Sequence, residues 1–312
     1  MLSGTNPVQR APWRAASRAA RDVDEHAAHL SGWQQRYDQL GGGAFEGRLE
    51  EALGERVQLF RERTSRRLRQ RCEVWPGALW IGLTEADDGS RLNGRRVPPG
   101  GVMASGTAGG FELVTPEGHA IVGLVVARDA LQRHAPGLVL PAGEDAACWR
   151  VDPALRRDVL ARARAVLALA AAGAAAPPES TVLELAATLI AAAQPAPPER
   201  GNAAARRRLV AQAHELVQAE PELPPSVDEL CRRLHVSRRT LQYAFDEEAG
   251  VSPLAYLRSV RLNGVRRLLR EPAPGQTVQA AAAAWGFWNL SAFAADYRRQ
   301  FGERPSETLA RA

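Results

Sequence analysis

The stretch from Ser226 to Gly250 (SVDELCRRLHVSRRTLQYAFDEEAG) constrains the fold more than any other part of this chain. Its first half carries apolar residues at positions i, i+3, i+4 and i+7, which is the spacing of one helix face. They are Val227, Leu230, Cys231 and Leu234. Ser237 is suited to cap a second helix. The inner face of that helix would consist of Leu241, Ala244 and Phe245. Two short helices joined by a tight turn indicate a helix-turn-helix motif.

The outer side of the second helix is left with hydrogen-bonding side chains, which are Ser237, Arg238, Arg239, Gln242 and Tyr243. In the DNA major groove an arginine donates two hydrogen bonds to guanine, and a glutamine pairs with adenine. Arg239 and Gln242 lie three positions apart on one side, so we expect them to read base edges. Tyr243 is expected to stack on a sugar or to pack on a thymine methyl. Ser237 and Arg238 are expected to hold phosphates. The alternative is that the two arginines only form a solvated surface pair.

A weaker copy of the pattern begins at Thr277 (TVQAAAAAWGFWNLSAFAADYRRQFG). The inner spacing of the first pair returns at Val278, Ala281, Ala282 and Trp285, and then at Phe293 and Tyr297. Between the copies, residues 252–270 (SPLAYLRSVRLNGVRRLLR) predict one continuous helix with a leucine-rich packing face. A helix of about 18 residues spans roughly 27 Å. That length suits two recognition helices about one turn of B-DNA apart, roughly 34 Å.

The outer face of the second copy is poorer in hydrogen-bonding groups. It is expected to consist of Asn289, Ser291, Ala292, Ala294 and Ala295, followed by Arg298 and Arg299. Such a face either reads methyl groups and DNA shape, or mainly positions the protein through the two arginines. Asp296 would repel phosphate, so we expect it to pair with an arginine or to face RNA polymerase. Trp285 and Phe287 are expected to be core residues.

At these residues the C-terminal third, from about Arg206 to the end, resembles the AraC/XylS family of transcription regulators. The resemblance rests on the paired motifs, the joining helix and the closing segment GFWNLSAFAADYRRQFGERPSE. It implies double-stranded DNA and RNA polymerase as partners, a small-molecule effector, activation as the usual mode, and a homodimer held by helices of the N-terminal domain. Many relatives carry an arginine at the position of Ala295, and this departure weakens the case for base reading by the second copy.

A second likeness concerns the closing segment and the stretch LFRERTSRRLRQR…WPGALWIGL. Both are similar to the branch of the family that contains the ethanolamine-operon activator. That branch would make ethanolamine the effector, together with adenosylcobalamin. No single residue of this chain requires that ligand, and the family also includes sensors of sugars, aromatic acids and amino acids.

The length and charge of the chain fit two domains. At 312 residues it is too long for one typical domain, and 45% hydrophobic residues are enough to build packed cores. Residues 206–312 hold 16 arginines against 12 acidic residues, a net charge of +4, out of +5 for the whole chain. This surplus lies where phosphate contact requires it. We expect a flexible lead-in over residues 1–30, an effector-sensing and dimerisation domain over 31–194, a linker over 195–205 and the DNA-binding domain over 206–312.

Between the lead-in and the linker, short segments rich in branched and aromatic residues alternate with glycine, proline and aspartate turns. The sequence therefore predicts an α+β chain. Its N-terminal domain would be an antiparallel β-roll or barrel with flanking helices, and its C-terminal domain all-α, with two helix-turn-helix units joined by a long helix. Residues 45–71 read either as a helix or as a hairpin, and the family likeness favours the hairpin. Two amphipathic helices, over 152–172 and 180–193, either mediate dimerisation or simply cover the barrel.

The interior of the predicted barrel is where we expect an effector pocket. Its candidate lining residues are Trp75, Trp80, Met103 and Phe111, with Val122 beside them. Each of them is also a natural core residue. His119 heads a strand beside a glycine turn and is expected to be exposed and idle.

Other classes of function find little support in the sequence. It has no Gly-rich phosphate loop, HExxH, CxxC or GxSxG pattern, so we expect no catalytic residues, no metal site and no enzyme activity. Three cysteines without regular spacing argue against a disulfide framework. No apolar run reaches the length of a membrane span, and the start lacks a signal-like segment, so a cytoplasmic protein without a membrane partner is expected. The alternative functions are a small β-barrel enzyme fused to a DNA-binding module and an architectural DNA-bending protein.

Overall fold

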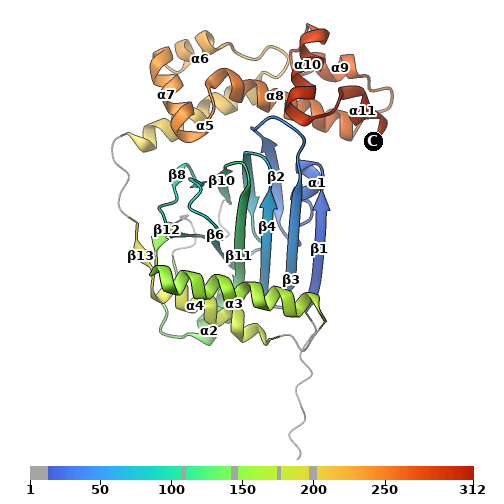
Figure 1. Ribbon diagram of the computed structural model, residues 1–312. Coiled ribbons are helices and arrows are strands. Elements are labelled where there is room, and N and C mark those ends of the chain that lie inside the picture. The colour runs from blue at the N-terminus through green and yellow to red at the C-terminus, as the bar shows by residue number, and fades with distance from the viewer. Residues whose placement is uncertain (1–12, 107–109, 142–146, 174–176, 197–201) are drawn as a thin grey trace, which may run out of the picture.

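The computed structural model describes residues 13–106, 110–141, 147–173, 177–196 and 202–312. A sheet-rich domain is followed by a helical domain that lies across one end of the sheets (Figure 1). Every strand pairing within the described ranges is antiparallel. The predicted α+β architecture, with a β-roll before an all-α domain, is therefore confirmed.

The larger sheet has the order β1-β3-β4-β11-β6-β9-β12-β13. Its strands are β1 (Arg14–Ala20), β3 (Gly47–Leu53), β4 (Val57–Thr64), β11 (His119–Ala127), β6 (Ala78–Thr84), β9 (Gly101–Gly106), β12 (Ala147–Arg150) and β13 (Gln194–Pro195). β3 and β4 pair directly around a short turn, so the prediction of a hairpin within 45–71 is confirmed and the helix alternative is wrong.

The smaller sheet has the order β2-β5-β10-β7-β8. Its strands are β2 (Gln34–Gln39), β5 (Leu68–Glu73), β10 (Phe111–Thr115), β7 (Arg91–Leu92) and β8 (Arg95–Arg96). One apolar core fills the space between the two sheets, and a second lies on the outer side of the larger sheet. Successive side chains of a strand point to opposite faces. In β6, Trp80 accordingly faces the inner core while Leu79 and Ile81 face the outer one.

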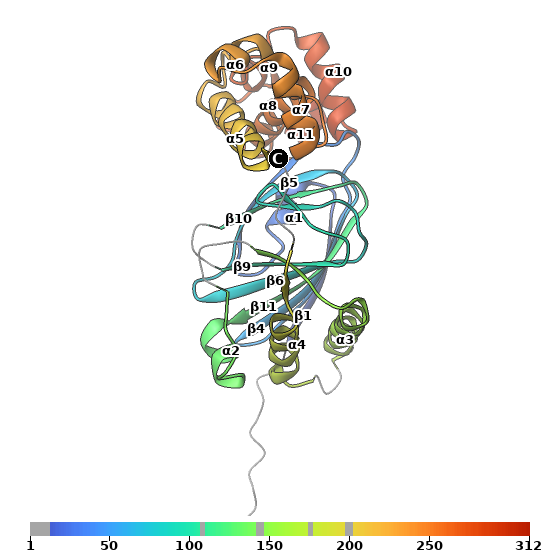
Figure 2. The same ribbon diagram turned by 90° about the vertical axis from the view of Figure 1, so that its left-hand side faces the viewer.

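Three helices cover the outer face of the larger sheet, at the end far from the helical domain (Figures 1 and 2). They are α2 (Arg128–His134), α3 (Pro153–Ala171) and α4 (Glu179–Ala191). Asp152 caps α3 by accepting hydrogen bonds from the backbone N–H groups of Ala154 and Leu155. The predicted helices over 152–172 and 180–193 are thus present, and they cover the sheet. Their role in dimerisation stays a prediction.

Three expectations about the N-terminal domain need correction. Within the lead-in, residues 1–12 lie outside the described residues, but β1 pairs along its whole length with β3, and α1 (Val23–Ala27) packs on the inner core. β1 consists of small residues and two arginines, so no alternation of apolar and polar residues marks this edge strand in the sequence. The first two residues of the proline-rich segment 194–201 form β13 on β12.

His119 is buried at 2% exposure, and its Nδ1 lies 2.5 Å from Asp88. The carboxylate pairs with Nδ1, whereas Nε2 is buried without a hydrogen-bond partner among the described residues.

The helical domain contains seven helices among residues 202–312. They are α5 (Ala203–Ala219), α6 (Val227–Arg233), α7 (Arg238–Glu248), α8 (Pro253–Arg270), α9 (Val278–Ala283), α10 (Leu290–Phe301) and α11 (Pro305–Ala310). One apolar cluster joins α5, α6 and α7 to the first half of α8. A second joins α9, α10 and α11 to its second half. The predicted continuous helix α8 is therefore the common support of both units, although one of its leucines, Leu254, is exposed.

Polar contacts attach α8 to the sheet domain. Arg266 Nε lies 2.6 Å from the buried Asp22 carboxylate that precedes α1. Arg267 pairs with Asp38 at 2.9 Å. Asn263 exchanges two hydrogen bonds with the backbone of Gln39, at 3.0 and 2.9 Å. A buried charge is stable only when it is paired, so these contacts fix the helical domain on the end of β2.

Candidate DNA-binding surface

The first helix-turn-helix unit consists of α6 and α7. Ser226 caps α6 and Ser237 caps α7, each through a hydrogen bond from a backbone N–H three residues later. Leu230, Leu241 and Phe245 are fully buried in the core that α6 and α7 share with α5 and α8. His235 takes a positive φ of 53° in the turn. The unit therefore has the helix order, the Ser237 cap and the inner face predicted from the sequence, and Ser226 provides a further cap that was not predicted.

The predicted contact residues of α7 are all exposed, but most are already engaged. They are Ser237, Arg238, Arg239, Gln242 and Tyr243. Both oxygens of Asp228 accept hydrogen bonds from Arg238 at 2.5 Å, and these bonds lower the pKa of Asp228. Gln242 Nε2 donates to both oxygens of Asp246, at 2.9 and 3.0 Å. The Arg206 guanidinium lies 5.4 Å from the centre of the Tyr243 ring.

Arg239 differs from its neighbours on α7. Within the described part of the chain its side chain has no hydrogen bond or ion pair, and it is exposed. Ser237, by contrast, uses its hydroxyl oxygen to cap the helix, accepting from Thr240 N at 3.1 Å. Of the two arginines of α7 predicted to contact DNA, Arg239 is therefore the one whose donors are available without breaking a contact.

The second unit consists of α9 and α10. Phe293, Tyr297 and the two alanines Ala281 and Ala282 form its buried inner face. Trp285 lies directly over Gly264 of α8, where an added Cβ would lie 2.0 Å from the indole ring. This close approach needs glycine. Trp285 and Phe287 pack against the core of this unit, as predicted.

On α10 the predicted contact residues are again exposed. They are Asn289, Ser291, Ala292, Ala295, Arg298 and Arg299. The Asn289 side chain caps the helix, accepting from Ala292 N at 3.0 Å. Asp296 pairs with Arg299 at 3.0 Å and with Arg258 of α8 at 3.4 Å, so the expected arginine partner exists. Sequence reasoning missed Trp288 and Leu290, which are 69% and 40% exposed at the start of α10.

Both recognition helices meet the sheet domain at their C-terminal ends. Arg91 lies 3.6 Å from Glu248 at the end of α7. At the end of α10, Gly43 N donates to the carbonyl oxygens of Arg299 and Gln300 at 2.9 and 3.0 Å. The first turns of α7 and α10 are exposed instead. In helix-turn-helix proteins it is the N-terminal part of the recognition helix that contacts base edges, so the sheet domain leaves both contact faces accessible.

Comparison with known proteins bears on these two units. A family model described as a helix-turn-helix domain matches residues 230–311. The probable thc operon regulatory protein of Rhodococcus erythropolis is 33% identical over 102 residues, 32% of this chain and 31% of that protein. The XylDLEGF operon transcriptional activator of Pseudomonas putida is 35% identical over 85 residues, 27% of this chain and 26% of that protein. The chain thus spans less than a third of the length of these two curated relatives.

Among solved structures, a probable AraC family transcriptional regulator from Rhodopseudomonas palustris is 42% identical. The match covers 34% of this chain and 97% of that chain, with a TM-score of 0.31. The helical domain is an AraC-type helix-turn-helix domain, similar to that of AraC/XylS-family regulators, and the family model matches it from α6 to α11. The likeness to the ethanolamine-operon activator branch stays a prediction.

The predicted effector-pocket residues belong to the core between the two sheets or pack against it. Trp80, Met103 and Phe111 are at most 5% exposed between the two sheets, and Trp75 packs on the same cluster. The Trp80 and Phe111 rings stack with their centres 4.4 Å apart. A Cβ at Gly82 would lie 2.4 Å from the Trp80 ring. Aromatic rings fill the interior around Trp80 and Met103, so these two residues are core residues. Trp75 and Phe111 also line cavities, of about 500 and 580 Å³, and their role in effector binding stays a prediction.

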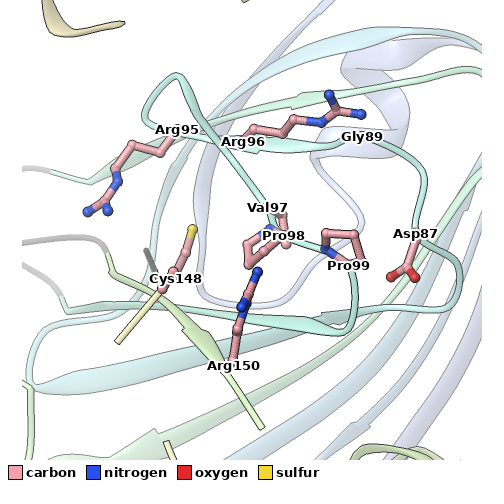
Figure 3. Close-up of a pocket in the computed structure, with 10 residues that line it drawn as sticks. Asp87, Gly89, Arg95, Arg96, Val97, Pro98, Pro99, Cys148 and Arg150 are labelled. Carbon is pink, nitrogen blue, oxygen red and sulfur yellow. The ribbon is translucent and has the colours of Figure 1, made fainter. Parts of the chain in front are cut away.

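A cavity of about 430 Å³ lies elsewhere on the sheet domain, between the loop after β8 and strand β12. Its lining includes Arg95, Arg96, Cys148 and Arg150. Figure 3 shows that the Arg95 and Arg96 side chains extend in opposite directions, while Arg150 points toward Pro98. The three guanidinium groups therefore do not converge on one point, and this arrangement gives no defined anion site.

The described residues contain no group of three or more His, Cys, Asp or Glu side chains placed to hold a metal ion. Within the same ranges no helix combines the length and the apolar character that a membrane crossing requires.

Proposed function

We propose that this chain is a sequence-specific, DNA-binding transcription regulator that contacts two adjacent major-groove segments. The observation that carries the proposal is the mounting of α7 and α10 on the single helix α8, with both first turns exposed. The 18 residues of α8 span roughly 27 Å, which is compatible with half-sites about one helical turn apart. The arginine surplus of residues 206–312 favours a polyanionic partner.

In the proposed complex the contact residues divide by chemistry. Arg239 donates to a guanine, and Gln242 reads an adenine once its amide leaves Asp246. Arg238 exchanges the Asp228 carboxylate for a phosphate, and Arg298 and Arg299 hold phosphates beside α10. Exposed ion pairs contribute only about 0–1 kcal/mol, so this exchange costs little. Tyr243 packs on a sugar or a thymine methyl, and Ser237 and Asn289 support the first turns as caps.

The sheet domain serves as the sensor in this proposal. It binds a small-molecule effector and forms a homodimer, a linker after β13 joins it to the helical domain, and the helical domain binds DNA. The XylDLEGF operon relatives are named as transcriptional activators, which supports activation together with RNA polymerase as the mode of action. Access to chromosomal DNA places the protein in the cytoplasm. Binding alone, without catalysis, accounts for this role.

Phase-shifted operator DNA tests the proposal. Genomic fragments bound by the full chain are selected first, and the two half-sites are located by footprinting. Inserting five base pairs between the half-sites turns the second one to the opposite face of the duplex, and inserting ten places it beyond the reach of α8. We expect both insertions to reduce affinity at least to that of a single half-site. The same insertions outside the site are the control, and undiminished affinity would show that only one unit contacts DNA.

A further inference from the structure

The start of α10 exposes apolar side chains where α7 exposes polar ones. Trp288 and Leu290 are 69% and 40% exposed, and Ala292 and Ala295 follow on the next turns. The equivalent positions of α7 carry Arg238, Thr240 and Tyr243, and Ser291 and Ala294 stand where α7 has Arg239 and Gln242. Large exposed apolar residues that cluster, rather than lie singly, mark a contact surface. Helix residues two positions apart do not share a face, so these exposed apolar residues surround the start of α10. We name Trp288, Leu290, Ala292 and Ala295 the apolar tip.

Few groups near the apolar tip remain to donate or accept a hydrogen bond from a base. The Asn289 side chain caps α10 through Ala292 N. Asp296 is held by Arg258 and Arg299. Ser291 keeps a hydroxyl, which discriminates poorly because it donates and accepts equally well. Hydrogen-bonded readout of the kind available to α7 is therefore almost absent from this face.

A groove beside the apolar tip continues its apolar character. It has a volume of about 550 Å³, and its lining includes Leu290, Phe293, Ala294 and Ala295 from α10. Arg298 and Arg304 also line it. An apolar strip with cations beside it matches the major groove, in which the base edges lie between two rows of phosphates. An apolar protein partner would leave these two arginines without a counter-charge.

Thymine is the one base that presents a methyl group in the major groove. We propose that α10 recognises its half-site through thymine methyl groups, which pack against the apolar tip, while α7 reads the other half-site by hydrogen bonds. This inference rests on the proposed function. The two half-sites would then differ in chemistry, since the first needs guanine and adenine edges and the second needs thymines at fixed positions.

Uracil substitution tests the methyl contact directly, because uracil pairs like thymine but lacks the methyl group. One randomised duplex library is copied with thymidine triphosphate and a second with deoxyuridine triphosphate. Duplexes that bind the full chain are then selected from each library. In the thymine library we expect fixed thymines in the α10 half-site. In the uracil library the preference at those positions should disappear, while the α7 half-site keeps its guanine and adenine pattern.

Affinity measurements on one selected duplex make the test quantitative. Burial of one methyl group stabilises by about 0.8 kcal/mol, so each thymine-to-uracil change in the α10 half-site should weaken binding about fourfold. In the Leu290→Ala variant, uracil at the base position that Leu290 contacts should cause almost no further loss of affinity. Leu254→Ala, which removes another exposed leucine from α8 (58% exposed), is the matched control and should leave the uracil effect unchanged.

The outcomes separate this inference from the proposed function. If the same thymine positions are selected in both libraries, or if guanine and adenine edges are selected under α10, two half-sites exist but methyl recognition is wrong. If the α10 half-site carries no preference and uracil has no effect, the apolar tip docks a protein or nothing. If neither library yields an enriched sequence, the proposed function itself fails.

Discussion

At the scale of single residues, the first recognition helix holds its polar side chains in two states. Arg238 and Gln242 are engaged by Asp228 and Asp246, whereas Arg239 is exposed without a hydrogen bond or ion pair in the described part of the chain. When Arg238 and Gln242 bind DNA they exchange one partner for another, so their net contribution to the free energy of DNA binding is reduced. Arg239 gains its contacts without such an exchange, which makes it the strongest candidate for direct base reading.

We expect Arg239→Ala to lose roughly 1–3 kcal/mol of discrimination at one base position. Arg298→Ala, at a proposed phosphate contact, should weaken binding to all sequences and reduce the salt dependence. Footprinting combined with titration against single-base variants of the selected site measures both effects. An unchanged base preference in Arg239→Ala would reject the role assigned to this arginine.

At the scale of elements, each recognition helix depends on a side-chain cap at its first turn. Ser237 caps α7 and Asn289 caps α10, so these residues orient the helices rather than standing free to read bases. α10 ends at Gly302, whose φ of 75° favours glycine. Capping defines where both contact faces begin, and it occupies the Oδ1 of Asn289.

Substitution of Asn289 separates capping from base reading. Asn289→Ala should cost about 1 kcal/mol of unfolding free energy, because Ala292 N loses its acceptor. Asn289→Ser keeps an acceptor and should retain most of that stability. Both variants should keep the base preference of the parent protein. Urea unfolding and library selection measure the two properties, and a changed preference in Asn289→Ser would show that Asn289 reads a base.

At the scale of the whole molecule, the sheet domain touches both helix-turn-helix units and the helix between them. Part of this interface is a buried chain from β5 to α5 and α8. Arg69 donates to His214 Nε2 at 2.8 Å, and the Tyr256 hydroxyl lies 3.2 Å from His214 Nδ1. His214 must therefore be neutral, with its proton on Nδ1. Burial and the Arg69 guanidinium lower the pKa of His214 to about 3, with Asp38 opposing them.

This interface predicts a dependence of stability on pH. In the unfolded chain His214 titrates near 6.5. The unfolded state therefore binds one more proton than the folded state between about 3 and 6.5. Stability should be fully present above pH 6.5 and should fall by about 1.4 kcal/mol per pH unit below it. His214→Gln should remove that part of the slope, as measured by urea unfolding at pH 7, 6 and 5. An identical slope in the variant would contradict the assignment.

The sequence by itself determined the helical domain and much of the sheet domain. Local signals carry both, because apolar spacing, capping serines and turn glycines act within a few residues. The two units, the joining helix, the 45–71 hairpin and the exposed faces of α7 and α10 all follow from such signals. The charge distribution along the sequence also distinguishes the two domains, because the arginine surplus lies in residues 206–312.

Tertiary structure alone decided the features that depend on distant partners. β1 forms because β3 supplies its ladder, although its own residues show no strand pattern. Trp80 and Phe111 from different strands stack in the interior, and Gly82 leaves room for the Trp80 ring. Which cations of α7 and α10 are already paired, and how Asp22, Asp38 and Gln39 hold α8, depends on approaches between residues far apart in the chain. Those distances are set by packing, and no local pattern encodes them.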